Sequence, residues 1–441
     1  MHAAALAVRR QPGTVSGIDA PLAPAVRRRR AFIILASLGI GYVASQFYRS
    51  FMAVITPELM RELDLSAEIT GALSGTFFFV FALAQIPVGM ALDRFGGRLV
   101  NAALLTVAVA GALLFALADG AAGLMAARAL MGIGVAGSLI GAYVVLGRWY
   151  APDRFATVGS VLVSVGMVGT VLATSPFAAL VGWIGWRGSF VIAAAVTAGL
   201  ALLVLAVVRD APPGHGFHAR RRESLGEALS GLGEVLRNPN LPYLFVLQLF
   251  LYSSMMTIMG LWGGPYLNDV HGLAPGPRGD VLFAMATAIL VGNLCYGPAD
   301  RFFDTRKGIV LSGGWCTVAL FAVLAAVPGL ALWQAASLLT AIGIVSAFMS
   351  TLHAHGRAIF PDRLVGRGMT VLNMAVVLGT AIAQTVSGWI IGAFADGTGP
   401  VPEIAYRLMF GYLGAALACA LIVYSRVPDV RPSQDQAGRR G

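Results

Sequence analysis

Long apolar segments separated by short polar ones run through the chain from residue 31 onward. A helix needs about 20 apolar residues to cross the hydrocarbon core of a membrane. The pattern therefore predicts twelve membrane-spanning helices. We expect them near residues 31–57, 67–91, 99–119, 122–147, 155–182, 188–208, 241–264, 280–298, 308–328, 330–356, 367–394 and 405–425.

A polar stretch with Pro212, Pro213 and Arg220–Arg222 divides these spans into two sets of six. The predicted fold class is an all-α integral membrane protein with two six-helix bundles. Its segments are expected to be a cytoplasmic tail over 1–30, a first bundle over 31–208, a cytoplasmic linker over 209–240, a second bundle over 241–426 and a cytoplasmic tail over 427–441.

Composition excludes a soluble protein. The chain is 57% hydrophobic and 12% charged, whereas a soluble domain carries about 25% charged residues. The net charge of +10 would favour a nucleic-acid partner in a soluble protein, but most arginines here lie between apolar spans. We assign them to membrane topology and to lipid headgroups, and we expect no nucleic-acid partner. The three cysteines lie in apolar stretches and predict neither a disulfide framework nor a metal or cofactor site.

The basic residues also predict the orientation of the chain. If the N-terminus is cytoplasmic, only Arg61, Arg187, Arg278 and Arg407 fall in segments on the outer side. Cytoplasmic loops carry an excess of Lys and Arg, so both termini are expected inside the cell. The expected location is the inner membrane of a bacterium.

Two short motifs recur half a chain apart. Residues 148–154 read Arg-x-x-x-Pro-Asp-Arg and recur 209 positions later at 357–363, and Asp93-Arg94 recurs 207 positions later as Asp300-Arg301. Two unrelated motifs with nearly the same offset indicate that the two bundles are copies of one unit, so they are expected to be pseudo-symmetric. Such internal repeats are typical of secondary transporters.

The loop between the second and third spans, G-x-x-x-D-R-x-G-x-R over 89–98, resembles the signature loop of the major facilitator superfamily. Arg128 followed by Gly132 and Gly134 is similar to that family's second motif, although Gly97 stands where the family usually has a basic residue. The resemblance implies a secondary transporter that works by alternating access, and we expect the protein to be a monomer. It also implies a latch that holds the halves together when the cytoplasmic side is closed, formed by Gly89, Asp93, Arg94, Gly96, Arg98, Asp300 and Arg301.

Charged groups inside the spans are few. Every Asp and Glu falls in a loop, a tail or a helix end, while Arg49 and Arg128 lie well inside the first and fourth spans. An intramembrane charge is costly and is by default a hypothesis of function. In the fold that the resemblance implies, these two spans line the central cavity. Two arginines without carboxylates leave a positive cavity for an anionic substrate; alternatively, Arg128 binds backbone carbonyls and Arg49 extends to the outer interface.

Other polar and aromatic residues are candidate substrate ligands. Gln46 and Tyr48 flank Arg49, and Asn373 and Gln384 lie in the eleventh span, where they either bind substrate or pack helices. Trp262 and Tyr266 near the outer end of the seventh span form either an aromatic rim of the site or part of an interfacial belt.

Two further patterns involve histidine. His353 and His355 lie near the cytoplasmic end of the tenth span, where either one is a candidate to carry a coupling proton or is simply interfacial. Met255 and Met259, with Met349 and His353, are spaced for a soft ion such as Cu(I). The two pairs differ in depth by about 10 Å or more, so gap-filling methionine is the preferred interpretation and no metal is assigned.

The sequence thus predicts a transporter of a small solute, with an organic anion as the preferred substrate, driven by proton symport or anion exchange. Efflux of amphipathic compounds and copper import are the alternatives within this class, and a non-transporting membrane receptor is the alternative outside it. The fifth span lacks the glycine-proline pair that the family's antiporters carry, which argues against drug efflux. The sequence contains no nucleotide-binding loop or nucleophile–base arrangement, so no enzymatic activity is predicted.

Overall fold

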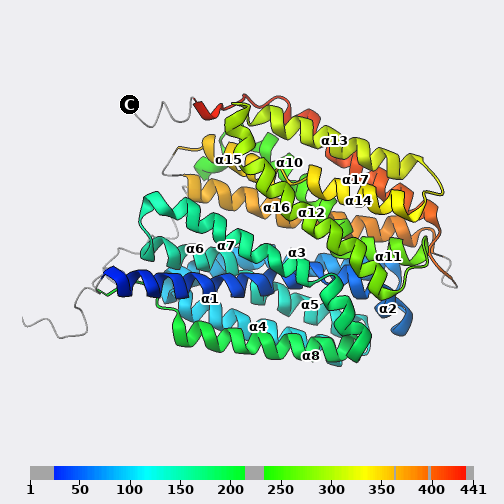
Figure 1. Cartoon of the computed structure of the whole chain (residues 1–441), viewed down its shortest axis with the longest axis horizontal. Helices are drawn as coiled ribbons and strands as arrows, with labels where there is room; N and C mark the ends of the chain where they lie inside the picture. Colours follow the sequence, from blue (N-terminus) through cyan, green and yellow to red (C-terminus); the bar gives the residue numbers. More distant parts are fainter. Residues whose placement is uncertain (1–23, 214–232, 362–363, 396–398, 434–441) are drawn as a thin grey trace, which may run out of the picture.

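The structure, a computed structural model, describes residues 24–213, 233–361, 364–395 and 399–433. In these ranges the regular structure is entirely helical, and it forms two halves that lie side by side (Figure 1). Most of the predicted N-terminal tail, the centre of the linker and the end of the C-terminal tail lie outside the described residues. The side chain of Arg301 does as well.

The N-terminal half contains eight helices among the described residues. They are α1 (Pro24–Ser50), α2 (Met52–Glu62), α3 (Ala67–Phe95), α4 (Gly97–Leu117), α5 (Ala121–Val135), α6 (Ser138–Trp149), α7 (Pro152–Leu172) and α8 (Ser175–Val207).

The C-terminal half repeats this plan with more interruptions. Its described elements are α10 (Leu241–Thr257), the π-helical segment η2 (Ile258–Trp262), α11 (Gly263–Asp269), α12 (Pro275–Phe302), α13 (Lys307–Ala326), α14 (Leu332–Val345), α15 (Met349–Ala358), α16 (Val365–Gly392) and α17 (Glu403–Tyr424).

The predicted spans correspond to these helices, several of which are broken. When α5 with α6, α10 with η2 and α11, and α14 with α15 are each counted as one segment, eleven described helical segments are long and apolar enough to cross a membrane. The shorter apolar helix Thr157–Leu172 lies where the fifth span is predicted. The fifth and sixth spans are separated by Gly185, whose φ of +74° breaks α8. The first span continues past its predicted end at residue 57 to Glu62. Glu58 therefore lies in α2, four residues before the end of that helix.

Helix breaks occur at equivalent positions of the two halves. The first span breaks at Phe51, between α1 and α2, and the seventh span contains the π-helical turn centred on Gly260, 209 positions later. The two breaks lie against each other, because a Cβ on Gly260 would be 3.1 Å from the Arg49 carbonyl oxygen. Interrupted helices at corresponding positions are the usual sign of a transporter's central site.

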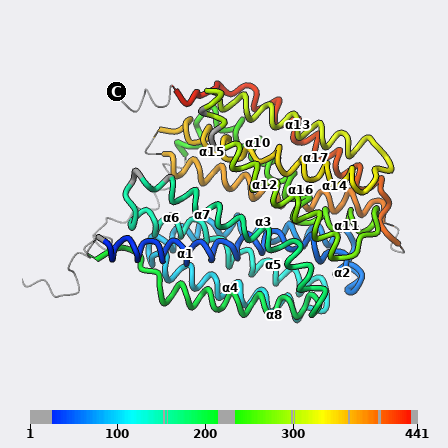
Figure 2. Tube along the Cα trace, viewed as in Figure 1, coloured from blue at the N-terminus to red at the C-terminus, as the bar shows by residue number. Residues whose placement is uncertain are grey.

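The two halves meet along three seams. One of them, between α3 and α16, runs through the middle of the molecule (Figure 2). Helix α3 packs on α16, α12 packs on α7 and α8, and α2 packs on η2 and α11. Glycine permits the closest approaches. A Cβ on Gly71 would lie 2.8 Å from the Cα of Gly388, and one on Gly264 would overlap the carbonyl oxygen of Ala53. Small residues at such crossings let backbones touch.

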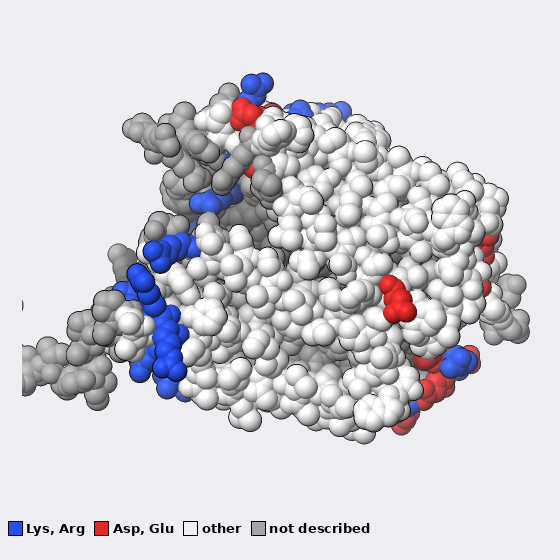
Figure 3. All heavy atoms as spheres, viewed as in Figure 1, with Lys and Arg blue, Asp and Glu red and all other residues white. Residues whose placement is uncertain are grey.

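Charged side chains gather at the two ends of the molecule and leave a broad uncharged surface between them (Figure 3). We call the end where α1, α4 and α13 begin the basic end, because it carries the exposed Arg27–Arg30 and Arg94. The other end, where α2 and α11 terminate, is called the opposite end. The uncharged surface matches the hydrocarbon core of a bilayer.

Candidate functional site

Arg49 lies in the last turn of α1, next to the break at Phe51. The residue is 9% exposed, and its guanidinium carbon stands 4.4 Å from the centre of the Phe81 ring on α3. It makes no hydrogen bond or ion pair with any described residue. Of its nitrogen atoms, only Nε is buried without a partner, so the two terminal amino groups reach space open to water or a solute. A charge placed in this way favours an anion.

Arg128 on α5 is placed differently. Its side chain is fully buried; Nη1 donates to the carbonyl of Tyr48 at 2.9 Å, and Nη2 donates to Ser74 at 3.4 Å. The guanidinium also lies over the rings of Phe51 and Phe77. It therefore satisfies a carbonyl freed at the break of the first span, which corresponds to the backbone-binding alternative expected from the sequence.

The residues that flank Arg49 pack within the N-terminal half. The hydroxyl of Tyr48 lies 2.8 Å from that of Thr197 on α8, and Tyr48 is 1% exposed. Gln46 is turned toward α7, where its amide nitrogen lies 3.9 Å from the sulfur of Met167. In this conformation Tyr48 has no surface to offer a solute.

The candidates in the C-terminal half are also engaged. Asn373 on α16 donates to Gln85 on α3 at 3.3 Å across the two halves, and Gln384 donates to the carbonyl of Met256 at 3.3 Å. Trp262 is fully buried and donates to Ser387 at 2.8 Å. Tyr266 is 3% exposed. Both rings are enclosed by neighbouring helices, so in this conformation they form neither an exposed rim of a site nor part of an interfacial belt.

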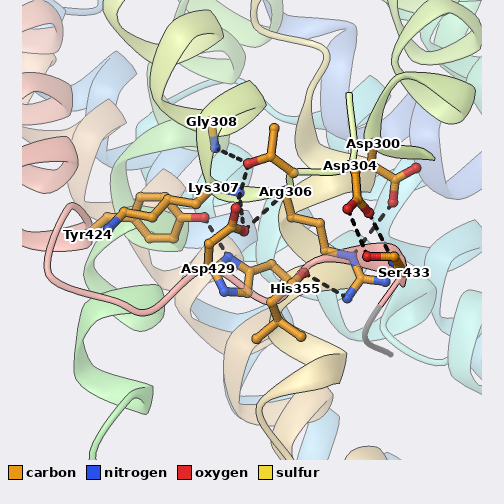
Figure 4. A network of polar contacts seen from close by, with 11 residues as sticks. Asp300, Asp304, Arg306, Lys307, Gly308, His355, Tyr424, Asp429 and Ser433 are labelled. Carbon is orange, nitrogen blue, oxygen red and sulfur yellow. Dashed lines mark hydrogen bonds and ion pairs between the residues drawn. The ribbon is translucent and has the colours of Figure 1, made fainter. Parts of the chain in front are cut away.

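The two histidines of α15 have different surroundings. His355 is fully buried; its Nε2 donates to the carbonyl of Pro428 at 3.1 Å, and its Nδ1 lies 2.6 Å from the hydroxyl of Tyr424 (Figure 4). His353 is half-buried and has no hydrogen bond with a described residue. Of the two, only His353 has ring nitrogens available for a proton carried with a solute.

The methionines that the sequence spaces together with His353 as for Cu(I), an arrangement to which no metal is assigned, lie on separate segments. Met255 belongs to α10, Met259 to η2 and Met349 to α15. Met259 is 1% exposed and belongs to the apolar core, which agrees with a packing role. The described residues contain no group of three or more His, Cys, Asp or Glu that could hold a metal ion.

Within the signature loop, Arg98 is fixed inside the N-terminal half. Its backbone nitrogen donates to the carboxylate of Asp210 at 2.9 Å, and its Nε donates to the carbonyl of Leu205 at 2.8 Å. Gly96 has a φ of +82°, and a Cβ there would lie 2.7 Å from the same carboxylate. Glycine is therefore required at this position. The carboxylate of Asp210, just after the sixth span, therefore fixes the start of the third span. We call this arrangement a brace.

The C-terminal half contains the same brace at its basic end (Figure 4). Asp429, which follows the twelfth span, accepts hydrogen bonds from the backbone nitrogens of Arg306 and Lys307 and from the hydroxyl of Thr305. Burial acts to raise the pKa of Asp429, but these hydrogen bonds outweigh it and lower the pKa. Asp300, the counterpart of Asp93, lies 3.6 Å from the guanidinium of Arg306.

Sequence reasoning missed the ion pair at the opposite end. Arg278 lies at the start of α12 and not in an outer loop, and its side chain is 1% exposed. Its Nη2 donates to both carboxylate oxygens of Glu58, at 2.7 and 2.9 Å, and to the carbonyl of Val54 at 2.7 Å. Nearby, Ser175 on α8 donates to Asp280 on α12. These bonds join the two halves, so the opposite end of the molecule is closed.

An apolar groove of about 670 Å³ lies between α3 and α4 and is lined by residues such as Leu83, Pro87 and Leu99. Its walls offer almost no polar atoms, and Leu83 and Leu99 are more than half exposed. The groove therefore lacks the ligands that an anion needs, and it is not the candidate site.

Comparison with known proteins decides the family. The sequence model of the Major Facilitator Superfamily matches residues 38–294, which is more than half of the chain. The chain belongs to the major facilitator superfamily. The solved structures agree, since a bacterial homologue of the human lysosomal transporter Spinster, in an inward-facing and occupied conformation, superimposes with a TM-score of 0.74. That match has 19% identity and covers 89% of this chain and 95% of the homologue.

Relatives of this superfamily member include transporters of anions. A probable nitrate/nitrite transporter of Mycobacterium tuberculosis is 27% identical over 287 residues, covering 64% of this chain and 69% of the relative. A putative tartrate transporter of Agrobacterium vitis is 23% identical over 368 residues, covering 76% of this chain and 82% of the relative. The chain is therefore a multi-pass membrane transporter of small solutes and not an enzyme.

Proposed function

We propose that this superfamily member moves a small organic anion across the inner membrane by alternating access, with Arg49 as the residue that binds the substrate's negative charge. The observation that carries the proposal is the guanidinium of Arg49, which is nearly buried, lacks an acidic partner among the described residues and keeps its terminal amino groups accessible. A planar guanidinium presents two parallel donors that match a carboxylate.

The number of available cations sets the charge of the substrate. Arg128 is occupied by Tyr48 and Ser74 and is fully buried. One accessible arginine neutralises one negative charge, so a monoanion is the expected cargo, or a dianion that takes up a proton. The relatives that transport nitrate or nitrite and tartrate support an anionic substrate for this chain as well.

The orientation follows from charge. The basic end, with Arg27–Arg30 and Arg94, is placed in the cytoplasm together with both termini, because cytoplasmic segments carry the excess of Lys and Arg. The opposite end, closed by Glu58 and Arg278, is then the outer end. In this arrangement substrate reaches Arg49 from the cytoplasmic side, and the outer seams must part in the other half of the cycle. The signature-loop residues of the basic end would close that side.

Transport against a gradient requires a coupled ion or a second anion. His353 is the proposed proton carrier, because it is half-buried, has no hydrogen-bond partner among the described residues and belongs to the tenth span. His355 is assigned a structural role, because its two ring nitrogens are engaged by Tyr424 and Pro428. If His353→Gln abolishes uptake driven by a pH gradient but retains exchange of one anion for another, the protein is a proton symporter.

Uptake by proteoliposomes tests the proposal. Intact protein should accumulate labelled organic anions, while Arg49→Gln should lose at least about tenfold of the initial rate and Arg49→Lys should retain part of it, because a lysine keeps the charge but not the two parallel donors. Equal uptake by intact protein and Arg49→Gln would exclude Arg49 as the anion ligand. Flux of neutral solutes with no anion flux would exclude the anion proposal itself.

A further inference from the structure

The apolar groove between α3 and α4 arises because these two helices diverge. Only Gly96 separates them at the basic end. From there α3 packs on α16 and α5, whereas α4 packs on α8 and α5. The facing walls carry small side chains, Ala84 and Ala91 on α3 and Ala103 on α4, and Ile133 of α5 also lines the space. A groove therefore remains open between the two helices.

The length of the groove matches one leaflet of a bilayer. Its lining on α3 runs from Val80 to Phe95, 15 positions apart, which is about 22 Å at 1.5 Å per residue. A bilayer is about 40–45 Å thick with its headgroups, so one leaflet takes up about 20–22 Å. Phe95 is the last residue of α3 at the basic end. The groove therefore covers the leaflet on that side and ends near the middle of the membrane.

The width of the groove suits a single hydrocarbon chain. A volume of about 670 Å³ spread over about 22 Å corresponds to a mean cross-section of about 30 Å². An α-helix with its side chains is about 10–12 Å across, or about 80–110 Å² in section. A helix from a second copy of the chain is therefore too thick, and it would need a groove that crosses both leaflets.

A hydrocarbon chain alone does not select one lipid from the membrane. Lipid tails are as apolar as leucine, so moving a tail from the bilayer into an apolar groove brings no hydrophobic gain. Close packing of the chain in the groove gives only a preference of shape. A specific lipid must therefore be held by its headgroup as well, at the basic end where the groove begins.

A cation stands at that place. Arg94 is exposed, and its guanidinium carbon lies 5.3 Å from the centre of the Phe95 ring, which lines the groove. Arg94 makes no hydrogen bond or ion pair with any described residue, whereas Asp93 before it is engaged within the protein. A guanidinium binds phosphate through parallel donors, and basic residues near the headgroups attract anionic lipids. A headgroup ammonium would gain less here.

We propose that the groove and Arg94 form a binding site for an anionic phospholipid of the leaflet at the basic end. One acyl chain lies in the groove between α3 and α4, and the phosphate lies on Arg94. The site is separate from Arg49 and does not depend on the proposed anion transport. Because α3 also packs on α16, the bound lipid contacts a helix of the seam between the two halves.

Native mass spectrometry of the purified, delipidated full-length protein, titrated with dioleoyl phosphatidylglycerol, tests the site. Ala103→Phe and Ala91→Phe place a ring in the groove, and each should weaken the first binding constant at least about fivefold. Arg94→Gln should weaken it about 2- to 5-fold, the value of an exposed ion pair, and should abolish the preference over dioleoyl phosphatidylethanolamine. The matched controls, Ala195→Phe and Arg28→Gln at exposed positions of α8 and α1, should change neither.

Three results would overturn the inference. Equal binding by intact protein, Ala103→Phe and Ala195→Phe, or equal weakening by both variants, would show that the groove selects no lipid chain. An unchanged preference for phosphatidylglycerol in Arg94→Gln would exclude Arg94 as the phosphate ligand. If the intact protein is a dimer that Ala103→Phe separates, the occupant of the groove is a second copy of the chain.

Discussion

Arg278 of α12 donates to both carboxylate oxygens of Glu58 on α2, across the boundary between the two halves, while a third bond goes to the carbonyl of Val54. The arginine side chain is 1% exposed and that of Glu58 is 17% exposed. A buried pair of this kind costs much more to break than a surface pair, because either partner left alone is a charge without compensation. We therefore interpret it as the group that holds the outer end closed.

Glu58→Gln or Arg278→Gln should open the outer end. Breaking a buried pair costs about 3–5 kcal/mol, against about 0–1 kcal/mol for an exposed one. The readout is the labelling rate of Leu267→Cys by a membrane-impermeant maleimide, after Cys295, Cys316 and Cys419 have been replaced. Leu267 is fully buried at this end, so it should label at least about fivefold faster when the pair is broken.

The control for this experiment is Arg187→Gln. Arg187 pairs with Glu62 within one half, and the two side chains are 37% and 45% exposed. The labelling rate should stay within about twofold of the parent. Equal rates in all three variants would show that Glu58 and Arg278 do not hold the outer end closed.

Gly264→Ala should impair transport without unfolding the protein. The added methyl would overlap the carbonyl oxygen of Ala53, so α11 and α2 must separate and the closed outer end becomes less stable. The initial rate of uptake should fall at least about tenfold. Gly276→Ala is the control, because no atom lies within 4 Å of its Cβ position. An unchanged rate for Gly264→Ala would mean that the close contact is dispensable.

Asp429→Asn should lower the thermal stability at neutral pH by about 1–3 kcal/mol, the value of hydrogen bonds to a charged acceptor. The pKa of Asp429 is lowered in the folded protein from the ordinary 3.8. Its contribution is therefore complete above that value and is lost as the pH falls through the lower folded pKa. The melting-temperature gap between intact protein and variant should hold from pH 7 to about pH 5 and shrink below pH 3.8. A difference in melting temperature that grows on acidification would contradict this assignment. The control is Asp119→Asn at an exposed position, which should have the melting temperature of the intact protein.

Replacing each of the two intramembrane arginines should give a different phenotype. Arg128→Met leaves the carbonyl of Tyr48 without its donor, so it should lower the melting temperature while the folded fraction keeps its anion affinity within about twofold. Arg49→Met removes a charge that has no partner, so it should lose affinity and leave stability unchanged or raised. Loss of affinity in Arg128→Met at an unchanged melting temperature would place Arg128 in the binding site.

The sequence identified the spans, the duplication and the family because these depend on hydropathy and spacing. Arg49 could be found for the same reason, as a charge in an apolar segment. Glu58 could not be found in this way, since Pro57 and nearby charges end the apolar run while the helix continues to Glu62. Its partner Arg278 is 220 positions away, and no local pattern connects the two.

The braces of the basic end have a counterpart in the sequence. Asp210 and Asp429 each stand two positions after a fully buried valine, Val208 or Val427, at the ends of the sixth and twelfth spans.

The most direct test of the account compares a negatively charged ligand with a neutral ligand of nearly the same size and shape. Titration of the purified protein with glycerate and with its neutral amide, glyceramide, measures how much the site gains from a negative charge. The account predicts that intact protein prefers glycerate by at least about 30-fold, since hydrogen bonds between charged groups contribute about 1.5–3 kcal/mol each, and that Arg49→Gln abolishes the preference. If the intact protein binds both ligands equally, or if Arg49→Gln retains the preference, Arg49 does not bind the substrate's negative charge.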